Sequence, residues 1–195
     1  MKESVKIKKI RNKLLRGCKK AFIGSKVVFG EGPCPSRIMI IGEAPGRDET
    51  RLERPFVGRA GRFFVGIIED VLGRERKDVY ISNVVKIWPR IPTKRGRTRP
   101  PTEFEKKFFL PCLYDEIAAV NPRVVVTVGK TALSALFPSG KFVPNRWVKD
   151  KRGFSLMPVY HPAYILRRQR EIKELTLGLR RALYEVRKRL EGRGG

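Results

Sequence analysis

Four short apolar runs, separated by segments with helical spacing, constrain the fold of this chain more than any other feature of its sequence. Each run has the length of a buried strand: 37–41 (RIMII), 78–83 (DVYISN), 123–128 (RVVVTV) and 155–160 (SLMPVY). Strands that alternate with helices favour a layered α/β fold. We therefore predict one doubly wound α/β domain over residues 1–195, whose ligand lies at the carboxyl ends of the strands.

The helices are predicted from apolar residues that recur every three or four positions. They cover 58–72, 102–120 and 130–136, with a strongly basic helix at about 1–20 and a long C-terminal helix over about 163–191. The segment 89–101 carries five basic residues and is predicted to be a loop. The sequence shows no internal repeat or low-complexity linker that would divide this domain.

Charge limits the partners of the chain. Its 44 Lys and Arg residues against 19 Asp and Glu give a formal net charge of +25, and the sequence pI is about 10.7. An excess this large attracts phosphate backbones at long range, so nucleic acid is the favoured partner. The alternative is a thermophile's charged surface, which the scarcity of Asn and Gln supports but which does not explain the imbalance. Membrane binding is disfavoured because no helical pattern has a bulky apolar face.

The sequence also bears on the compartment and on the redox state. No apolar run reaches the roughly 18 residues that span a bilayer, and residues 1–20 lack the features of a signal peptide. We therefore expect a cytoplasmic protein, associated with the nucleoid of a prokaryote. The cysteines Cys18, Cys34 and Cys112 form no C-x-x-C pair and are expected to be free thiols.

The predicted strand ends carry the least generic residues of the chain: the segment 42–46 (GEAPG), Asn83, the segment 129–131 (GKT) and His161. Each signal is weak alone, since the glycines fit a tight turn, Asn83 fits a cap, and a single histidine is often a core residue. The GKT segment is not a P-loop, because Val124 stands where that motif requires glycine. Their common placement at one edge of the sheet makes them candidates for a single site, with His161 as a candidate catalytic residue.

Three ordered motifs resemble those of the thermostable family-4 uracil-DNA glycosylases. They are 42–46 (GEAPG) followed by 54–61 (RPFVGRAG), then 80–86 (YISNVVK) and 161–167 (HPAYILR), with 27–32 (VVFGEG) ahead of them. The resemblance implies a three-layer α/β/α domain with a four-stranded parallel sheet. It also implies a monofunctional DNA glycosylase that hydrolyses the bond between uracil and deoxyribose, the first step of base excision repair.

This resemblance implies a pocket for a uracil flipped out of the duplex. The Asn83 amide would accept from uracil N3–H and donate to O4, a pattern that cytosine reverses. Phe56 would stack on the ring, unless it is a plain core residue. His161, with the backbone N–H groups around Gly42 and Ala44, would donate to O2 as uracil leaves as an anion.

The group that positions the attacking water is left open by the sequence. Related glycosylase families place an aspartate where this chain has Ala44. Glu43 or Glu49 is then the candidate catalytic residue that orients water or shapes the pocket against thymine. The alternative is that both are solvated loop carboxylates.

DNA contacts are predicted on two segments. The basic loop supplies four phosphate contacts: Lys94, Arg95, Arg97 and Arg99. The turn at 164–168 resembles the family's DNA-penetrating loop, although a plain helix start is the competing interpretation. Its wedge would be Leu166 or Ile165, and its phosphate contacts would be Arg167 and Arg168.

The sequence departs from the family at the cofactor. Family-4 enzymes typically hold a [4Fe–4S] cluster with four cysteines, and the closest register places Leu15, Cys18, Ile87 and Phe109 at those positions. One thiolate cannot hold a cluster, and Cys112 as a substitute would still leave two ligands missing. We therefore expect no cofactor and no metal site, and we expect the apolar residues to fill the space as a small core.

Two alternative functions stay open at this point: a non-catalytic DNA-binding module, and a damaged-base protein of the same fold with broader specificity, such as for hypoxanthine. Covalent trapping of the abasic product is not expected, because the loop at 91–99 has no histidine. The expected partner is uracil-containing DNA, single- or double-stranded, bound by a monomer. A sliding clamp is left open as a second partner.

Overall fold

A computed structural model of the chain describes residues 4–91 and 96–192. Its core is a sheet with the strand order β2-β1-β5-β7-β6. The predicted parallel strands are confirmed as β2 (Tyr80–Asn83), β1 (Ile38–Gly42), β5 (Val124–Val128) and β7 (Ser155–Val159). A short edge strand that the sequence did not predict, β6 (Val148–Lys149), pairs antiparallel with β7.

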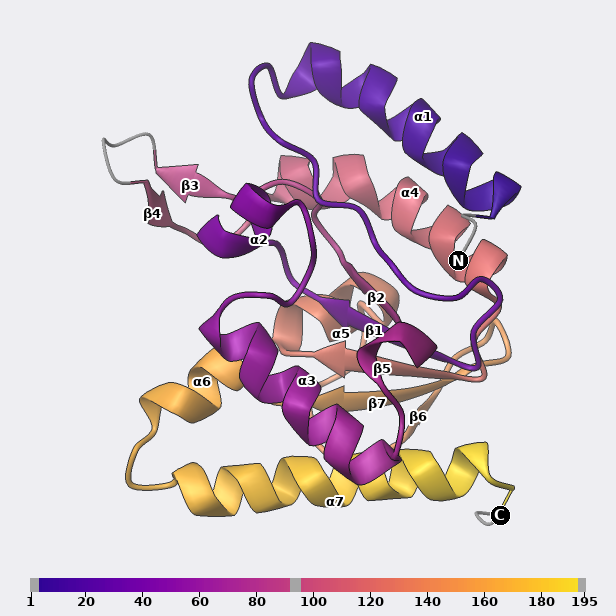
Figure 1. The fold of residues 1–195 in the computed structure, drawn as a ribbon, viewed down its shortest axis with the longest axis vertical. Helices are drawn as coiled ribbons and strands as arrows, with labels where there is room; N and C mark the ends of the chain where they lie inside the picture. Colours follow the sequence, from indigo (N-terminus) through magenta and orange to yellow (C-terminus); the bar gives the residue numbers. More distant parts are fainter. Residues whose placement is uncertain (1–3, 92–95, 193–195) are drawn as a thin grey trace.

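Helices cover both faces of this sheet and complete a three-layer α/β/α fold (Figure 1). One face packs against α3 (Arg59–Leu72), α6 (Pro162–Arg167) and α7 (Ile172–Leu190). The opposite face packs against α1 (Val5–Ala21), α4 (Glu103–Val120) and α5 (Lys130–Leu136). The alternation of side chains along β1 makes this division: Ile38 and Ile40 enter the first core, and Met39 and Ile41 the second.

The C-terminal helix predicted over 163–191 is two helices, α6 and α7. Between them the chain turns, and local polar contacts hold the turn: Arg168 Nη1 donates to Glu171 at 2.9 Å, and Gln169 Nε2 donates to the Leu166 carbonyl at 2.8 Å. These contacts leave no trace in the apolar spacing, which is why the pattern predicted a single helix.

Two further segments form structure where loops were expected. The charged segment after β1 contains α2 (Arg47–Leu52). The basic loop carries the short strands β3 (Arg90–Ile91) and β4 (Arg97–Thr98), which pair antiparallel. Residues 92–95 between β3 and β4, among them the predicted phosphate contacts Lys94 and Arg95, lie outside the described residues. A 3-10 turn at Arg76–Asp78, labelled η1, leads into β2.

The carboxyl ends of the parallel strands lie at one edge of the sheet, as this topology requires. Gly42 ends β1 directly beside Asn83, which ends β2. Gly129 follows β5, and His161 follows β7 as the N-cap of α6. The edge therefore brings together the segments that the sequence analysis selected.

Candidate active site

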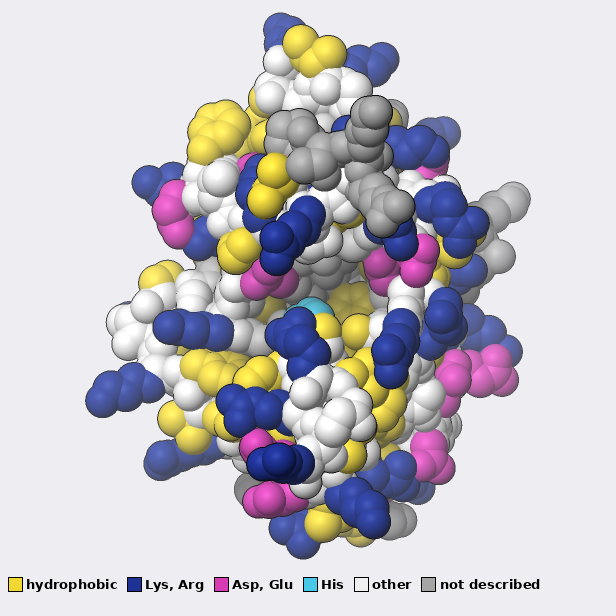
Figure 2. All heavy atoms as spheres, turned by 90° about the vertical axis from the view of Figure 1, so that its left-hand side faces the viewer, with side chains coloured by type: hydrophobic (Ala, Val, Ile, Leu, Met, Phe, Trp, Pro, Cys, Tyr) yellow, Lys and Arg dark blue, Asp and Glu magenta, His cyan; other side chains and the backbone are white. Residues whose placement is uncertain are grey.

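A cavity of about 790 Å³ opens at this edge of the sheet. The strand ends contribute Glu43, Asn83, Gly129 and His161 to its lining. Figure 2 looks onto this face, where the cyan of histidine shows in a hollow, with many Lys and Arg and fewer Asp and Glu side chains around it. The cavity is therefore both at the position that the topology predicts for a ligand and within a basic surface.

Gly42 allows two candidate residues to pack over the end of β1. A Cβ atom at Gly42 would lie 2.4 Å from Asn83 Oδ1 and 2.8 Å from Phe56 Cζ. Gly61 likewise leaves room for the backbone of Phe56, because a Cβ atom at Gly61 would lie 2.4 Å from the Phe56 carbonyl carbon. Phe56 is 7% exposed, and its ring centroid lies 5.7 Å from that of Phe64. These glycines place the amide of Asn83 and the ring of Phe56 side by side in the cavity.

The backbone of Asn83 is fixed from below by a buried lysine that the sequence analysis did not single out. Lys86 Nζ donates to the Asn83 carbonyl at 2.8 Å, to Ser82 Oγ at 2.5 Å and to Glu116 Oε2 at 2.6 Å. Within 4–91 and 96–192, by contrast, no group hydrogen-bonds the side-chain amide of Asn83, which is 3% exposed. The residue is held by its backbone while its amide is available to a ligand. A lysine inside the apolar run 84–87 was the available signal.

The ring of His161 has a defined proton position. Its Nδ1 accepts a hydrogen bond from the Ala163 N–H at 3.1 Å, so the neutral ring carries its proton on Nε2. Burial lowers the pKa of His161 below its ordinary value; the charge of Glu43 opposes this shift, and that of Arg167 adds to it. His161 is therefore a neutral Nε2–H donor at neutral pH.

The two candidate carboxylates have different surroundings. Glu49 accepts from the backbone N–H groups of Gly46 at 3.2 Å, Val57 at 3.1 Å and Gly58 at 2.7 Å, so both of its oxygens hold loops together. The carboxylate of Glu43 accepts at Oε2 from Thr131 Oγ1 at 2.5 Å, and no described residue donates to its Oε1. Of the two, Glu43 is the carboxylate with an oxygen available in the cavity.

Some of the predicted DNA-contact residues line the cavity, whereas others are held in contacts within the protein. Arg97 and Arg167 line the cavity, and so do three cations that the sequence analysis missed: Arg47, Arg59 and Lys130. Arg99 instead donates to Glu105 at 2.7 and 2.8 Å, where it supports the capping box of α4. Arg168 pairs with Glu171 and lies over the Tyr164 ring, and Leu166 is partly exposed on α6.

The positions that correspond to the family's cluster ligands do not fit a cluster. Cys18, Ile87 and Phe109 are buried in one apolar core, and the Phe22 ring stacks on Phe109 with centroids 5.3 Å apart. The expectation that Leu15 joins this core is wrong: Leu15 is 37% exposed, and Leu14 is buried in its place. A single thiol among aromatic and aliphatic side chains cannot replace four thiolates. In the described parts of the chain, no group of three His, Cys, Asp or Glu residues is arranged to hold a metal ion.

The fold is a mostly parallel α/β/α domain, and its cavity at the strand ends holds an amide, an imidazole and an aromatic ring. These features define an α/β protein that binds its ligand at the carboxyl ends of its strands. The family model described as "Uracil DNA glycosylase superfamily" matches residues 29–183. The chain therefore belongs to the uracil DNA glycosylase superfamily and, with the relatives that follow, to its type-4 group.

The relatives cover most of the chain. It is 38% identical to the type-4 uracil-DNA glycosylase of Thermotoga maritima over 162 residues. This match covers 78% of this chain and 79% of the relative. The type-4 uracil-DNA glycosylase of Saccharolobus solfataricus is 34% identical over 76% of this chain and 71% of its own length. The type-4 uracil-DNA glycosylase of Sulfurisphaera tokodaii is 32% identical over 82% of this chain and 76% of its own length.

Among the described residues, no helix is long and apolar enough to span a membrane.

Proposed function

We propose that this protein is a monofunctional uracil-DNA glycosylase, which flips uracil out of DNA and hydrolyses its N-glycosidic bond. The observation that carries the proposal is the Asn83 amide, which lies beside the Phe56 ring over Gly42 and has no partner within 4–91 and 96–192. Uracil satisfies such an amide at both of its atoms, since N3–H donates to Oδ1 and O4 accepts from Nδ2. With the amide in this same orientation, cytosine would leave both of its atoms unpaired, at a cost of about 1–3 kcal/mol for each group.

His161 stabilises the leaving group in this proposal. The glycosidic bond breaks with its electron pair moving to uracil, so negative charge develops on O2 and O4. A neutral imidazole that carries its proton on Nε2 donates a hydrogen bond to O2 without transferring the proton. Ala44, in the loop after Gly42, lines the same cavity, and its N–H is a further donor in this proposal.

Glu43 orients the attacking water. Its Oε2 is held by Thr131, and its Oε1, to which no residue within 4–91 and 96–192 donates, accepts a hydrogen bond from water beside the sugar. Thr131, on α5, thus acts on the water through Glu43. Glu49 holds the loop at 46 against the turn at 57–58, so we assign it a positioning role.

The cations that line the cavity hold the DNA. Two of them are Arg97, on β4 of the hairpin, and Arg167, on α6. Leu166, beside Arg167, is the wedge that fills the space of the flipped base. The formal charge of +25 strengthens this contact at long range. We propose that the protein acts as a monomer on the DNA of a prokaryotic nucleoid, and that it folds without an iron–sulfur cluster.

Strand cleavage after alkali tests this function. The substrates are oligonucleotides that carry uracil opposite guanine, uracil opposite adenine, single-stranded uracil or hypoxanthine, with a thymine-containing control. We expect excision of uracil, faster from the U·G mismatch than from the U·A pair because unpairing costs less there, and none of thymine. Absence of excision from every uracil substrate would overturn the proposal. Elemental analysis of the same preparation tests the cofactor, with an expected result of no stoichiometric iron.

A further inference from the structure

Phe56 has a backbone conformation that needs support. Its φ angle is +54°, in the left-handed region that non-glycine residues rarely adopt and that costs about 1–3 kcal/mol. It is buried beside Asn83, so a small change of this backbone would move the ring in the cavity. The structure must therefore hold the peptide groups on both sides of Phe56.

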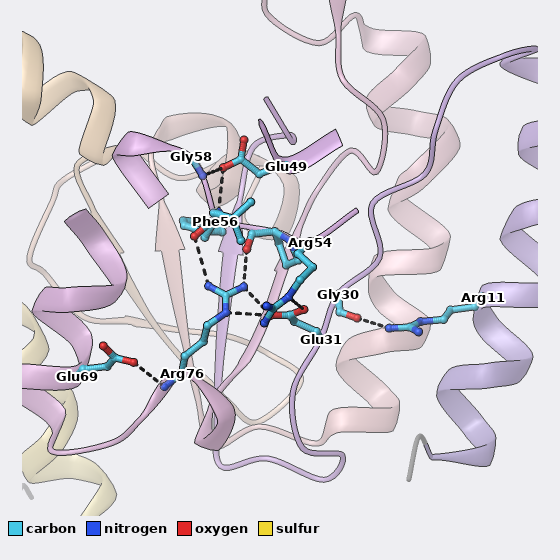
Figure 3. A network of polar contacts seen from close by, with 11 residues as sticks. Arg11, Gly30, Glu31, Glu49, Arg54, Phe56, Gly58, Glu69 and Arg76 are labelled. Carbon is cyan, nitrogen blue, oxygen red and sulfur yellow. Dashed lines mark hydrogen bonds and ion pairs between the residues drawn. The ribbon is translucent and has the colours of Figure 1, made fainter. Parts of the chain in front are cut away.

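One guanidinium contacts both of these peptide groups. Arg76 Nη2 donates to the Pro55 carbonyl at 2.5 Å, and Nη1 donates to the Phe56 carbonyl at 3.3 Å (Figure 3). Arg76 lies on η1, twenty residues further along the chain, and its side chain is 19% exposed. It holds the strained segment from outside the loop that contains Phe56.

Glu31 orients this guanidinium. Its Oε1 accepts from Arg76 Nε at 2.9 Å and from Nη2 at 2.6 Å, and Arg54 donates to the same carboxylate at 2.9 Å through two nitrogens. Burial opposes ionisation of Glu31, but the hydrogen bonds from the two arginines outweigh it and hold the pKa of the carboxyl below its ordinary value. The carboxylate is therefore charged at neutral pH and keeps Arg76 in one orientation.

Glu31 is in turn fixed to the strand that carries Asn83. Its backbone N–H donates to the Ile81 carbonyl at 2.9 Å, and its carbonyl accepts from the Ile81 N–H at 2.8 Å. Ile81 lies two residues before Asn83 on β2. A continuous set of hydrogen bonds thus runs from β2 through Glu31 and Arg76 to Phe56, and it fixes the distance between the aromatic ring and the amide.

We propose that Arg76, oriented by Glu31, is a positioning residue that holds Phe56 as the stacking surface for the flipped base. This inference rests on the proposed function. Arginine suits the role because its planar group reaches a carboxylate and two carbonyls at once, whereas a lysine ammonium is a point charge on a flexible stem. Arg76→Lys keeps the charge opposite Glu31 and loses the simultaneous contact with both carbonyls.

The test measures single-turnover excision of uracil at saturating enzyme, together with the affinity for undamaged duplex. We expect Arg76→Lys to slow excision by about tenfold, as weaker base stacking predicts, and to leave the affinity for undamaged duplex unchanged. The matched control is Arg152→Lys. Arg152 also donates twice to a carboxylate, Asp150, at 2.7 Å and once to a backbone carbonyl, that of Leu136, but it does not line the cavity. This control should keep the wild-type excision rate.

A double substitution separates positioning from general stability. If Arg76 acts through Phe56, then Arg76→Lys in a Phe56→Leu background should slow excision by no more than about twofold beyond Phe56→Leu alone, because coupled residues are not additive. Full additivity, a wild-type rate for Arg76→Lys, or an equal loss in the Arg152 control would each overturn the inference. An inactive wild-type chain would overturn the proposed function and this inference with it, so the two failures are distinguishable.

Discussion

His161 is held at the start of α6 with Nδ1 occupied and Nε2 protonated, which defines a donor of fixed direction. His161→Ala removes this donor from the developing charge on O2. We expect the single-turnover excision rate to fall by about 10²–10³, the usual effect of losing one such donor. Binding to undamaged duplex, measured by fluorescence anisotropy, should not change, because phosphate contacts are spread over several cations. An excision rate near that of the wild type would remove His161 from the mechanism.

Asn83→Asp tests the recognition of uracil. The carboxylate still accepts from N3–H but, when ionised, cannot donate to O4, so we expect uracil excision to fall by about 10- to 100-fold. A protonated aspartic acid can instead pair with cytosine, so slow excision of cytosine at low pH is the second expected result. Both rates are measured on matched oligonucleotides. Unchanged activity on uracil would contradict the assignment of Asn83, whose backbone stays fixed by Lys86 in this variant.

The sequence singled out these two residues because each lies at the carboxyl end of a predicted strand. It did not predict the pair formed by Lys86 and Glu116, because the two residues are thirty positions apart and meet only when α4 packs against the end of β2. Glu49 shows the same limit. Its residue type and its place in the loop after β1 suggested a catalytic role, whereas the N–H groups of Gly46 and of the turn at 57–58 donate to its carboxylate, which supports the positioning role proposed for it.

At the scale of elements, the central strands were predictable and the short elements were not. Strands β1 and β5 are buried along their whole length and are largely aliphatic, and burial decides their conformation. The hairpin of β3 and β4 depends on specific contacts instead: Trp88 Nε1 donates to Thr98 Oγ1 at 2.9 Å, and Gly96 lies against the Trp88 ring. Contacts of this kind leave no periodic pattern in the sequence, and they add Trp88 to the cavity lining.

The packing of α1 on α4 leads to a prediction about stability. Phe109 is fully buried at a position that the family resemblance aligns with a cluster ligand, and we propose that its side chain fills this space as part of the apolar core. Phe109→Ala should lower the free energy of unfolding by about 3–5 kcal/mol, measured by urea titration. Leu15→Ala is the matched control, and because Leu15 is 37% exposed its cost should be below about 1 kcal/mol. Wild-type stability that falls when a chelator is added would contradict this account.

At the scale of the whole molecule, the charge excess and the cavity reinforce each other. The cavity's cations come from elements that are distant in the sequence: Arg47 on α2, Arg59 on α3, Arg97 on β4, Lys130 on α5 and Arg167 on α6. They form one rim only because the strand ends meet at a single edge. A net charge distributed evenly, as on a thermophile's solvated surface, would not require this convergence.

The salt dependence of DNA binding distinguishes these two explanations of the charge. Each phosphate contact adds about 0.9 to the slope of log K against log salt concentration, so Arg97→Ala and Arg167→Ala should each reduce the slope by about 0.9. The preference for uracil-containing over undamaged duplex should stay the same, since neither residue contacts the base in this proposal. Arg187→Ala is the matched control, because Arg187 pairs with Glu191 on α7 and does not line the cavity. We expect its slope to equal that of the wild type. Equal slopes in all four proteins would show that the rim does not contact DNA, and the charge excess would then need the thermophile explanation.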